Sequence, residues 1–325
     1  MRVLVTGGAG FIGSHLVDLL LSQRHDVAVL DDYSTGNTSN LRNPGPVGTR
    51  RWRFWGSVTD PYDVHQALAI APDVVFHLAA QIDVRSSVAD PVGDAETNVM
   101  GTLRMLAASA DAQVRRFVYA SSAAIFGNAE VPTSLRMAPG GLPVAPVSPY
   151  GAAKVAAMAY CATYDQLGLP EVSTVVFSNV YGPRQRSGVV ARFARALLAG
   201  EPVTLYGDGQ NVRDYLYVAD AARALAWAGG CLTDRDGNVV PPPIGQPWLV
   251  GTGVGTTDQQ LLDLVGHEVY GDGTLANRSE VRMEPARAAD ARSSVFPPTG
   301  TLTTTTPLAE GIELTVEAVR KEIGS

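Results

Sequence analysis

The sequence predicts an α/β fold in which a doubly wound parallel sheet is followed by a smaller mixed α/β domain. Short β-branched runs alternate with helical stretches through the first half of the chain, as in βαβ units around a parallel sheet. A glycine-rich turn joins the first run to the first helical stretch. After residue 180 the alternation loosens, which indicates a second and less regular part.

The first domain is expected over residues 1–177, and segments within about 211–252 are expected to return to it. Its predicted strands are 2–6, 26–30, 51–55, 73–78, 116–120 and 173–177. Its predicted helices are 11–23, 61–70, 91–110 and 150–168. Asp60-Pro61 and Asp90-Pro91 mark two helix starts, because each places an N-cap acceptor before a proline at the first helical position.

The second domain is expected to span residues 178–325 and to bind the substrate. A helix near 188–199 should end at Gly200, and a strand should follow at 203–206. Asp220 and Thr257 are expected to open two further helices, and 314–323 to form a closing one. The stretch 229–247, rich in proline and glycine, is expected to be a surface loop.

Composition excludes several classes of function. The 325 residues are 46% hydrophobic, which suits a packed core. The 25 Lys and Arg residues are outnumbered by 32 Asp and Glu residues, so the net charge of −7 gives no field that would gather nucleic acid or an anionic membrane. Cys161 and Cys231 form no metal-ligand or disulfide pattern. No leader or membrane-length apolar segment is apparent, so we expect a cytoplasmic protein without a metal.

Basic and aromatic residues alternate in TRRWRFW (49–55), a pattern that can bind nucleic acid. The segment lies where the third strand of the sheet is expected. Its aromatic side chains are therefore predicted to pack under the sheet while its arginines reach solvent.

The first predicted strand runs into TGGAGFIGSHL, in which Gly8, Gly10 and Gly13 satisfy G-x-G-x-x-G and Gly7 extends the motif. Such glycines let the backbone turn tightly and approach a pyrophosphate at the start of a helix. Asp31 ends the second predicted strand, where a carboxylate can accept from the adenosine ribose hydroxyls. The context predicts a Rossmann-type dinucleotide site.

The residues after Asp31 indicate which dinucleotide is bound. Asp32 adds a second negative charge, and no Arg or Lys follows until Arg42. Because these carboxylates would repel a 2′-phosphate, the sequence favours NAD over NADP.

A second motif, SPYGAAKVAAMAY, places Tyr150 and Lys154 four residues apart and so on one face of a helix. A phenol with a pKa near 10 is a poor base at neutral pH, but a neighbouring ammonium and a positively charged nicotinamide both favour the phenolate. Tyr150 is therefore a candidate base, activated by Lys154.

Several further motifs occur in one order along the chain. They are HLAAQ (77–81), NVMGT (98–102), YASSAAIFG (119–127), SNVYGPRQ (178–185), YGDGQNVRDYLYVAD (206–220) and a late Arg287 in PARAAD. Together with the glycine and tyrosine motifs they resemble the extended short-chain dehydrogenase/reductase family, and within its NAD-dependent epimerase/dehydratase group the epimerases of the UDP-glucose 4-epimerase type. The likeness covers nearly the whole chain.

The resemblance implies a set of site residues. The catalytic set would be Ser122, Tyr150 and Lys154. The NAD-binding set would be Gly7, Gly10, Phe11, Ile12, Gly13, Asp31, Asp32, Ser57, Val58, Leu78, Ala79, Ala80, Gln81, Asn98, Tyr150 and Lys154. The set for the nucleotide sugar would be Ser122, Asn179, Arg186, Val189, Arg192, Tyr206, Arg213, Arg287 and Asp290. Two departures are Ser57, where many relatives have Asp, and Val176, where many have Arg.

The two residues after Ser122 narrow the reaction. Dehydratases that resemble this chain carry Asp and Glu there, as acid and base, and decarboxylating relatives usually keep the Glu. Ala123 and Ala124 occupy these positions, and a methyl group moves no proton. The resemblance therefore implies 4-epimerisation of UDP-glucose and UDP-galactose through a transient 4-keto sugar, without net redox change.

Other interpretations remain open from the sequence. Only Arg186-Ser187 separates YGPRQ from GVVARF, and Arg192 replaces an apolar residue, so UDP-glucuronate or another nucleotide sugar is an alternative substrate. A catalytically silent NAD-binding regulator and an NAD(P)H-consuming reductase are further alternatives. The family commonly dimerises through helices equivalent to 91–110 and 150–168, so a homodimer is expected.

Overall fold

The structure is a computed structural model that describes residues 1–43, 45–127, 144–232, 247–271, 279–285, 293–296 and 305–324. These residues form two compact units. The first comprises described residues within Met1–Gly127, Leu135–Phe177 and Ala221–Leu249. The described residues of the second lie within Ser178–Asp220 and Val250–Ser325.

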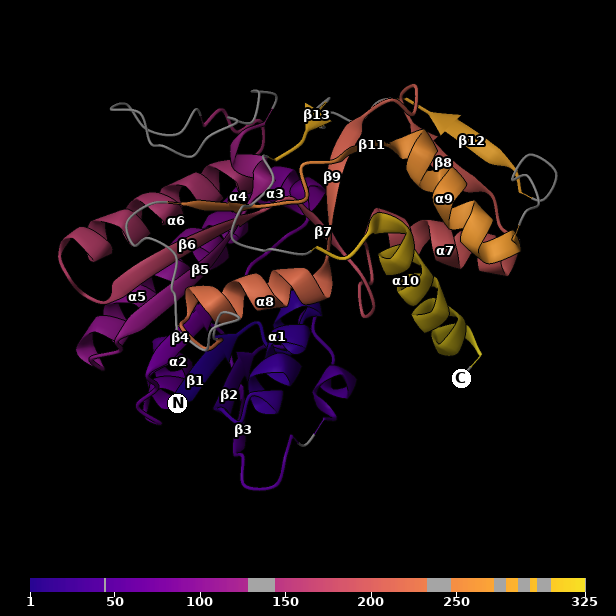
Figure 1. Cartoon of the computed structure of the whole chain (residues 1–325). Coiled ribbons are helices and arrows are strands. Elements are labelled where there is room, and N and C mark those ends of the chain that lie inside the picture. Colours follow the sequence, from indigo (N-terminus) through magenta and orange to yellow (C-terminus); the bar gives the residue numbers. More distant parts are fainter. Residues whose placement is uncertain are drawn as a thin grey trace. The chain divides into compact units, whose positions relative to one another are not determined.

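A seven-stranded sheet forms the centre of the first unit, with the strand order β10-β6-β5-β4-β1-β2-β3. Its strands are β1 (Arg2–Thr6), β2 (Asp26–Asp31), β3 (Arg51–Trp55), β4 (Val74–His77), β5 (Arg116–Ser122), β6 (Glu171–Phe177) and β10 (Trp248–Val250). The pairs from β3 to β6 are all parallel. Strands β1, β2 and β4 are almost wholly buried, as expected for a sheet covered on both faces. Helices line both faces, which confirms the predicted doubly wound fold (Figure 1).

The helices of the first unit include two that begin where the Asp60-Pro61 and Asp90-Pro91 signals predict. The helices of the unit are α1 (Phe11–Ser22), α2 (Pro61–Leu68), α3 (Val84–Ala89), α4 (Pro91–Ala95), α5 (Gly101–Asp111), α6 (Pro149–Gln166) and most of α8 (Val218–Ala228). Asp60 accepts a hydrogen bond from the amide of Tyr62 and Asp90 from that of Gly93, so both are N-caps.

Two helix predictions were wrong in detail. The helix expected over 91–110 is divided, because a π-helical turn (Glu96–Met100) separates α4 from α5. The helix expected to open at Asp220 begins two residues earlier, and the Asp220 carboxylate accepts from the amide of Thr306 instead of capping α8.

In its described residues, the second unit consists of short strands and three helices that pack on one another. Its elements are β7 (Asn179–Tyr181), α7 (Val189–Ala199), β8 (Val203–Tyr206), β9 (Val212–Tyr217), β11 (Gly255–Thr257), α9 (Asp258–Tyr270), β12 (Val281–Glu284), β13 (Ser293–Ser294) and α10 (Leu308–Ile323). Strand β9 pairs with β7, β11 and β13, and β8 pairs with β12. Helix α10 is longer than predicted, and of the predicted loop 229–247, residues 233–246 lie outside the described residues.

Strand β3 forms the edge of the sheet. Trp52 and Phe54 are half-buried and Arg53 is exposed, as expected. Trp55 differs from the prediction because its side chain is 79% exposed and meets the Tyr33 ring edge to face. Among the helices of the described segments, none is long and apolar enough to cross a membrane.

Candidate active site

The glycine-rich turn between β1 and α1 is too crowded for side chains. Gly7 has a φ of +67°, and a Cβ on Gly13 would lie 2.2 Å from the Gly7 carbonyl oxygen. The Gly10 amide donates to that same carbonyl. No side chain caps α1 within the described residues, and its first turn carries no acid. The first amides of α1 are therefore not bonded to a capping side chain of the described segments and can bind an anion, so the loop fits a dinucleotide pyrophosphate.

Asp31 is buried at the end of β2 and holds the glycine turn in place. Its two carboxylate oxygens accept from the amides of Ala9 and Tyr33, each at 2.8 Å. Burial raises the pKa of Asp31, and these amide hydrogen bonds act in the opposite direction. Each carboxylate oxygen has a second lone pair for a ribose hydroxyl. Asp31 thus fits the predicted role on the adenosine ribose.

Ser122 ends β5 and caps a short 3-10 turn, η3 (Ala123–Ile125). Its hydroxyl oxygen accepts from the amide of Ala124 at 3.2 Å. A hydroxyl can accept and donate at once, so the Ser122 side chain can also donate to the phenol of Tyr150, and this interaction lowers the pKa of the phenol. The Ala124 amide therefore leaves the Ser122 proton available for the Tyr150 oxygen.

Helix α6 starts against this turn. Ser148 caps it by accepting from the amide of Gly151 at 3.1 Å, and Pro149 takes the first helical position. A Cβ on Gly151 would lie 2.5 Å from the Ala124 carbonyl oxygen. Only glycine allows this approach, which brings Tyr150, the residue before Gly151, to Ser122.

Lys154 is buried one turn after Tyr150, with 4% of the residue exposed. Its ammonium donates to the Ala120 carbonyl at 3.0 Å and lies 5.9 Å from the centroid of the Tyr150 ring. Burial lowers the pKa of Lys154 to about 8, so it remains mostly protonated at neutral pH.

In the protein alone, burial determines the state of the Tyr150 phenol. Burial raises the pKa of Tyr150 to about 12, the nearby charge of Asp94 raises it as well, and the hydrogen bond with Ser122 lowers it. The sequence predicts activation of this phenol by Lys154 together with a cationic nicotinamide. Of these two positive charges, the chain itself supplies only the Lys154 ammonium, and the nicotinamide would come with the cofactor.

Asn98 lies in the π-helical turn between α4 and α5 and is buried. Its amide nitrogen donates to the Gln81 carbonyl at 2.9 Å and to Asp94 at 3.0 Å. Turns of this kind frequently occur at functional sites because they re-aim side chains.

A buried polar chain links the glycine turn to this π-helical turn. The Thr6 hydroxyl accepts from the amides of Leu78 and Ala79 at 3.2 and 3.1 Å, so its proton points to Nδ1 of His77, 2.8 Å away. His77 must then carry its own proton on Nε2.

The series of buried hydrogen bonds continues from His77 to Thr102 and then to Asn98. Nε2 of His77 donates to the Thr102 hydroxyl at 3.0 Å, and Thr102 donates to the Asn98 carbonyl at 2.7 Å. Burial, and next the charge of Lys154, lower the pKa of His77 to about 3. The imidazole is therefore neutral and joins β1, β4 and the Asn98 turn.

Comparison with known proteins agrees with this geometry. Residues 3–236 match the model of the NAD dependent epimerase/dehydratase family. The UDP-glucose 4-epimerase of Mycolicibacterium smegmatis is 40% identical over 334 residues, which covers 99% of both chains. The chain belongs to the NAD-dependent epimerase/dehydratase family.

Two solved structures of similar proteins contain ligands. The UDP-glucose 4-epimerase of Thermotoga maritima with UDP-glucose is 34% identical, with a TM-score of 0.85 over 99% of this chain and 100% of that chain. MoeE5 in complex with UDP-glucuronic acid and NAD is 32% identical, with a TM-score of 0.79 over 99% of this chain and 100% of that chain. NAD is the cofactor of the family, and the glycine turn and Asp31 of this chain fit it.

The structure brings the three predicted catalytic residues together. Ser122, Tyr150 and Lys154 meet at the end of β5 in the first unit, to which every predicted NAD-binding residue also belongs. Asp32 is exposed, whereas Val58 and Asn98 are buried. The roles assigned to these residues stay predictions.

The described residues of the predicted nucleotide-sugar set, other than Ser122, belong to the second unit. Asn179 lies on β7, Tyr206 on β8 and Arg213 on β9. Three more lie between residues 186 and 192. Arg186 is exposed, Val189 begins α7 and is half-buried, and Arg192 on α7 is exposed. Arg287 and Asp290 lie outside the described residues.

Sequence reasoning missed Asp94, His77 and Thr102. His77 and Thr102 stand inside the motifs HLAAQ and NVMGT, which pointed to their segments but not to a hydrogen bond between them. Asp94 precedes Asn98 by four residues, a spacing that places both on one side of a helix. No signal in the sequence shows that its carboxylate is buried.

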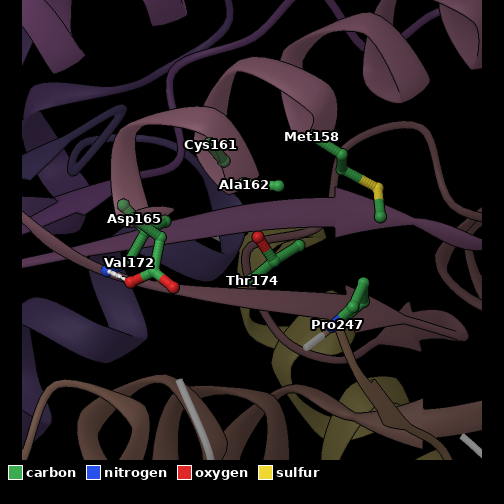
Figure 2. A pocket seen from close by; sticks show the side chains of 7 residues that line it. All are labelled: Met158, Cys161, Ala162, Asp165, Val172, Thr174 and Pro247. Atoms are coloured by element: carbon green, nitrogen blue, oxygen red, sulfur yellow. Dashed lines mark hydrogen bonds between the residues drawn. The ribbon is translucent and has the colours of Figure 1, made fainter. Parts of the chain in front are cut away.

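A small hollow on the first unit is not part of the candidate active site. Figure 2 shows it between α6 and β6, with the Asp165 carboxylate accepting from the amide of Val172. Its volume of about 30 Å³ is that of one water molecule in the liquid. It cannot hold a nucleotide sugar.

Proposed function

We propose that this protein is an NAD-dependent nucleotide-sugar 4-epimerase, an isomerase that interconverts UDP-glucose and UDP-galactose. One observation carries the proposal. Ser122, Tyr150 and Lys154 meet at the end of β5, while the adjoining positions hold Ala123 and Ala124, which can neither protonate a leaving hydroxyl nor remove a C5 proton. A 4-keto sugar formed here has no route except reduction.

The residues divide the work as follows. Tyr150 takes the proton of the sugar C4 hydroxyl, and Ser122 donates a hydrogen bond to the developing anion. NAD, held by the glycine turn and Asp31, supplies a reversible hydride acceptor at C4. The 4-keto sugar then turns about its diphosphate linkage. Tyr150 returns the proton as C4 is reduced from the opposite face, so the reaction balances without an external oxidant or reductant.

The diphosphate and uridine are assigned to the second unit. Arg213 and Arg287 suit bidentate recognition of phosphate, and Asn179, Tyr206 and Asp290 supply further polar groups. Val189 supplies an apolar contact. In this assignment the first unit carries the redox chemistry and the second unit holds the nucleotide.

The test is the stoichiometry of the reaction. The purified protein, with NAD and without a reductant, is incubated with UDP-glucose, and the sugar configuration is followed by NMR. We expect UDP-galactose to accumulate to equilibrium without net NADH formation. Turnover that occurs only with added NADH or NADPH, and consumes it in step with product, would overturn the proposal in favour of a reductase. Bound NAD without turnover of any nucleotide sugar under either condition would favour a regulator.

UDP-glucuronate is the second candidate substrate. Arg186 and Arg192 are exposed cations at a shortened loop, and MoeE5, which is similar to this chain, was solved with UDP-glucuronic acid. A guanidinium can bind the C6 carboxylate in a bidentate pair. If this substrate is used, Arg192→Ala should raise its KM about tenfold or more, since charge-assisted bonds contribute about 1.5–3 kcal/mol. UDP-glucose should be unaffected. An unchanged KM for UDP-glucuronate excludes the carboxylate clamp.

We propose a homodimer formed through the helices of residues 91–110 and 150–168. The exposed apolar side chains on these segments support it, since Val92 is 77% exposed, Tyr160 41% and Met100 40%. Light scattering at micromolar concentration tests the proposal, and a monomer would contradict it. A cytoplasmic location stays a prediction from composition.

A further inference from the structure

Asp94 is a buried carboxylate beside the candidate catalytic helix. It lies on α4, which packs against α6, and is 2% exposed. Oδ1 accepts from the amide nitrogen of Gln81 at 2.8 Å and from that of Asn98 at 3.0 Å. Oδ2 is also buried and has no hydrogen-bond partner within the described residues. Burying a carboxylate with one oxygen unpaired costs free energy, so its presence calls for a functional explanation.

These bonds determine which way the Asn98 amide points. A carboxylate ion and a carbonyl only accept, so the Asn98 nitrogen must face Asp94 and the Gln81 carbonyl. The Asn98 amide oxygen is thereby turned to the other side, where it is buried and lacks a partner in the part of the chain that the structure describes. This leaves an oriented acceptor at a residue predicted to contact NAD.

Asp94 is a carboxylate, whereas the other titratable groups around Lys154 are an imidazole, two phenols and a thiol. The titratable groups that face this ammonium are His77 from β4, Tyr119 from β5, Cys161 and Tyr150 from α6, and Asp94 from α4. Burial keeps the imidazole, the phenols and the thiol neutral at pH 7. Asp94 is the remaining group of this set that can carry negative charge.

We propose that Asp94 is a positioning residue with two separable actions: Oδ1 orients the Asn98 amide for the cofactor, and the carboxylate, on a helix packed against α6, places a negative charge near the Lys154 ammonium. The first action concerns cofactor binding alone. The second bears on turnover only in so far as the proposed function of Tyr150 and Lys154 holds.

Two substitutions separate these actions. Asp94→Asn keeps an oxygen that accepts from Gln81 and Asn98 but removes the charge. Asp94→Leu has a similar volume and removes both. Glu96→Gln is the matched control, because Glu96 is a neighbouring acid on the same segment whose exposed carboxylate pairs with Arg104.

Cofactor binding is measured first, by titrating each cofactor-stripped protein with NAD across a pH series. We expect Asp94→Leu to bind NAD at least tenfold more weakly at pH 7, and Asp94→Asn and Glu96→Gln to match the wild type there. Above neutrality the Lys154 ammonium is lost as pH rises through its pKa of about 8. Without the carboxylate this pKa falls, so the loss of affinity in Asp94→Asn should move to lower pH by at least about 0.5 unit.

Turnover supplies an independent readout of the charge. The Asp94 charge raises the pKa values of both Lys154 and Tyr150. In Asp94→Asn both limbs of the pH–rate profile should therefore move to lower pH, which a purely structural role would not produce.

These measurements test the orienting action, the charge action and the proposed function separately. Wild-type affinity in Asp94→Leu overturns the orienting action. Coincident pH profiles of NAD affinity in Asp94→Asn and the wild type overturn the charge action. If the wild type epimerises no sugar, the proposed function fails, while the NAD titrations still decide the role of Asp94.

Discussion

Tyr150 illustrates how one side chain depends on its surroundings for its chemistry. Burial raises the pKa of its phenol to about 12, and the hydrogen bond from Ser122 does not offset this. The chain without NAD therefore keeps the phenol protonated at neutral pH. A positive charge beside the phenol would lower the pKa, so the base is expected to form only in the loaded enzyme.

Tyr150→Phe should lower the rate of epimerisation by about 10²–10⁴-fold, the usual contribution of a positioned acid or base. The NAD content of the purified protein should stay close to that of the wild type, because the glycine turn and Asp31 are unchanged. Tyr164→Phe, a half-buried tyrosine later on α6, is the control and should retain full activity. A Tyr150→Phe enzyme that turns over at the wild-type rate removes this phenol from the mechanism.

For single residues, the sequence shows which side chains could take part in catalysis, but not which of them are buried or what they contact. Tyr150 and Lys154 could be found because helical spacing places residues four apart on one face. Asp94 could not, since its role depends on burial and on the two amides that meet its carboxylate. Gly151 stands within a recognised motif, but the need for glycine there arises from the Ala124 carbonyl. This carbonyl lies 27 positions earlier in the chain.

At the scale of elements, strands and helix starts followed from local signals, and the π-helical turn did not. Residues 91–110 carry one continuous helical pattern, so nothing local distinguishes an i→i+5 turn at Glu96–Met100. The turn is held by distant groups, since Thr102 accepts from His77 of β4 and donates to the Asn98 carbonyl. A tertiary hydrogen bond thus defines the element that carries Asn98.

His77 makes the stability of these elements depend on pH. The pKa of its imidazole is lowered to about 3 in the folded chain, against an ordinary value of 6.5. The unfolded chain therefore binds a proton that the folded chain excludes between these values. The contribution is fully present above about pH 6.5 and is lost as pH falls toward 3, at up to about 1.4 kcal/mol per pH unit.

Urea unfolding of His77→Gln between about pH 4 and pH 6 tests this linkage. Glutamine can accept from Thr6 and donate to Thr102 but takes up no proton. Its free energy of unfolding should fall less steeply with decreasing pH than that of the wild type, by about 1 kcal/mol per pH unit. Parallel curves would mean that the imidazole is not held neutral by the fold.

For the whole molecule, the two kinds of binding group are separate in the chain. The predicted NAD contacts all belong to the first unit. Among the described residues, the predicted nucleotide-sugar contacts apart from Ser122 belong to the second. The overall class could be predicted because the strand–helix alternation of the first half is regular. In the second unit, α7, β8 and the start of α9 lie where the sequence predicts them. The sheet could not be predicted, because β7, β9, β11 and β13 are short strands whose pairing joins distant segments.

This separation predicts two independent increments in thermal stability. A ligand that binds only the folded chain adds about 2.7 kcal/mol at a concentration 100 times its Kd. NAD should raise the Tm of the cofactor-stripped protein, and UDP should raise it again. Arg213→Gln should keep the NAD increment and lose most of the UDP increment, since Arg213 is assigned to the diphosphate.

Arg282→Gln is the control, because the exposed guanidinium of Arg282 pairs with Glu280, and this variant should keep both increments. If Arg213→Gln retained the full UDP increment, the diphosphate would have to be held elsewhere, and the assignment of the second unit would lose its main support.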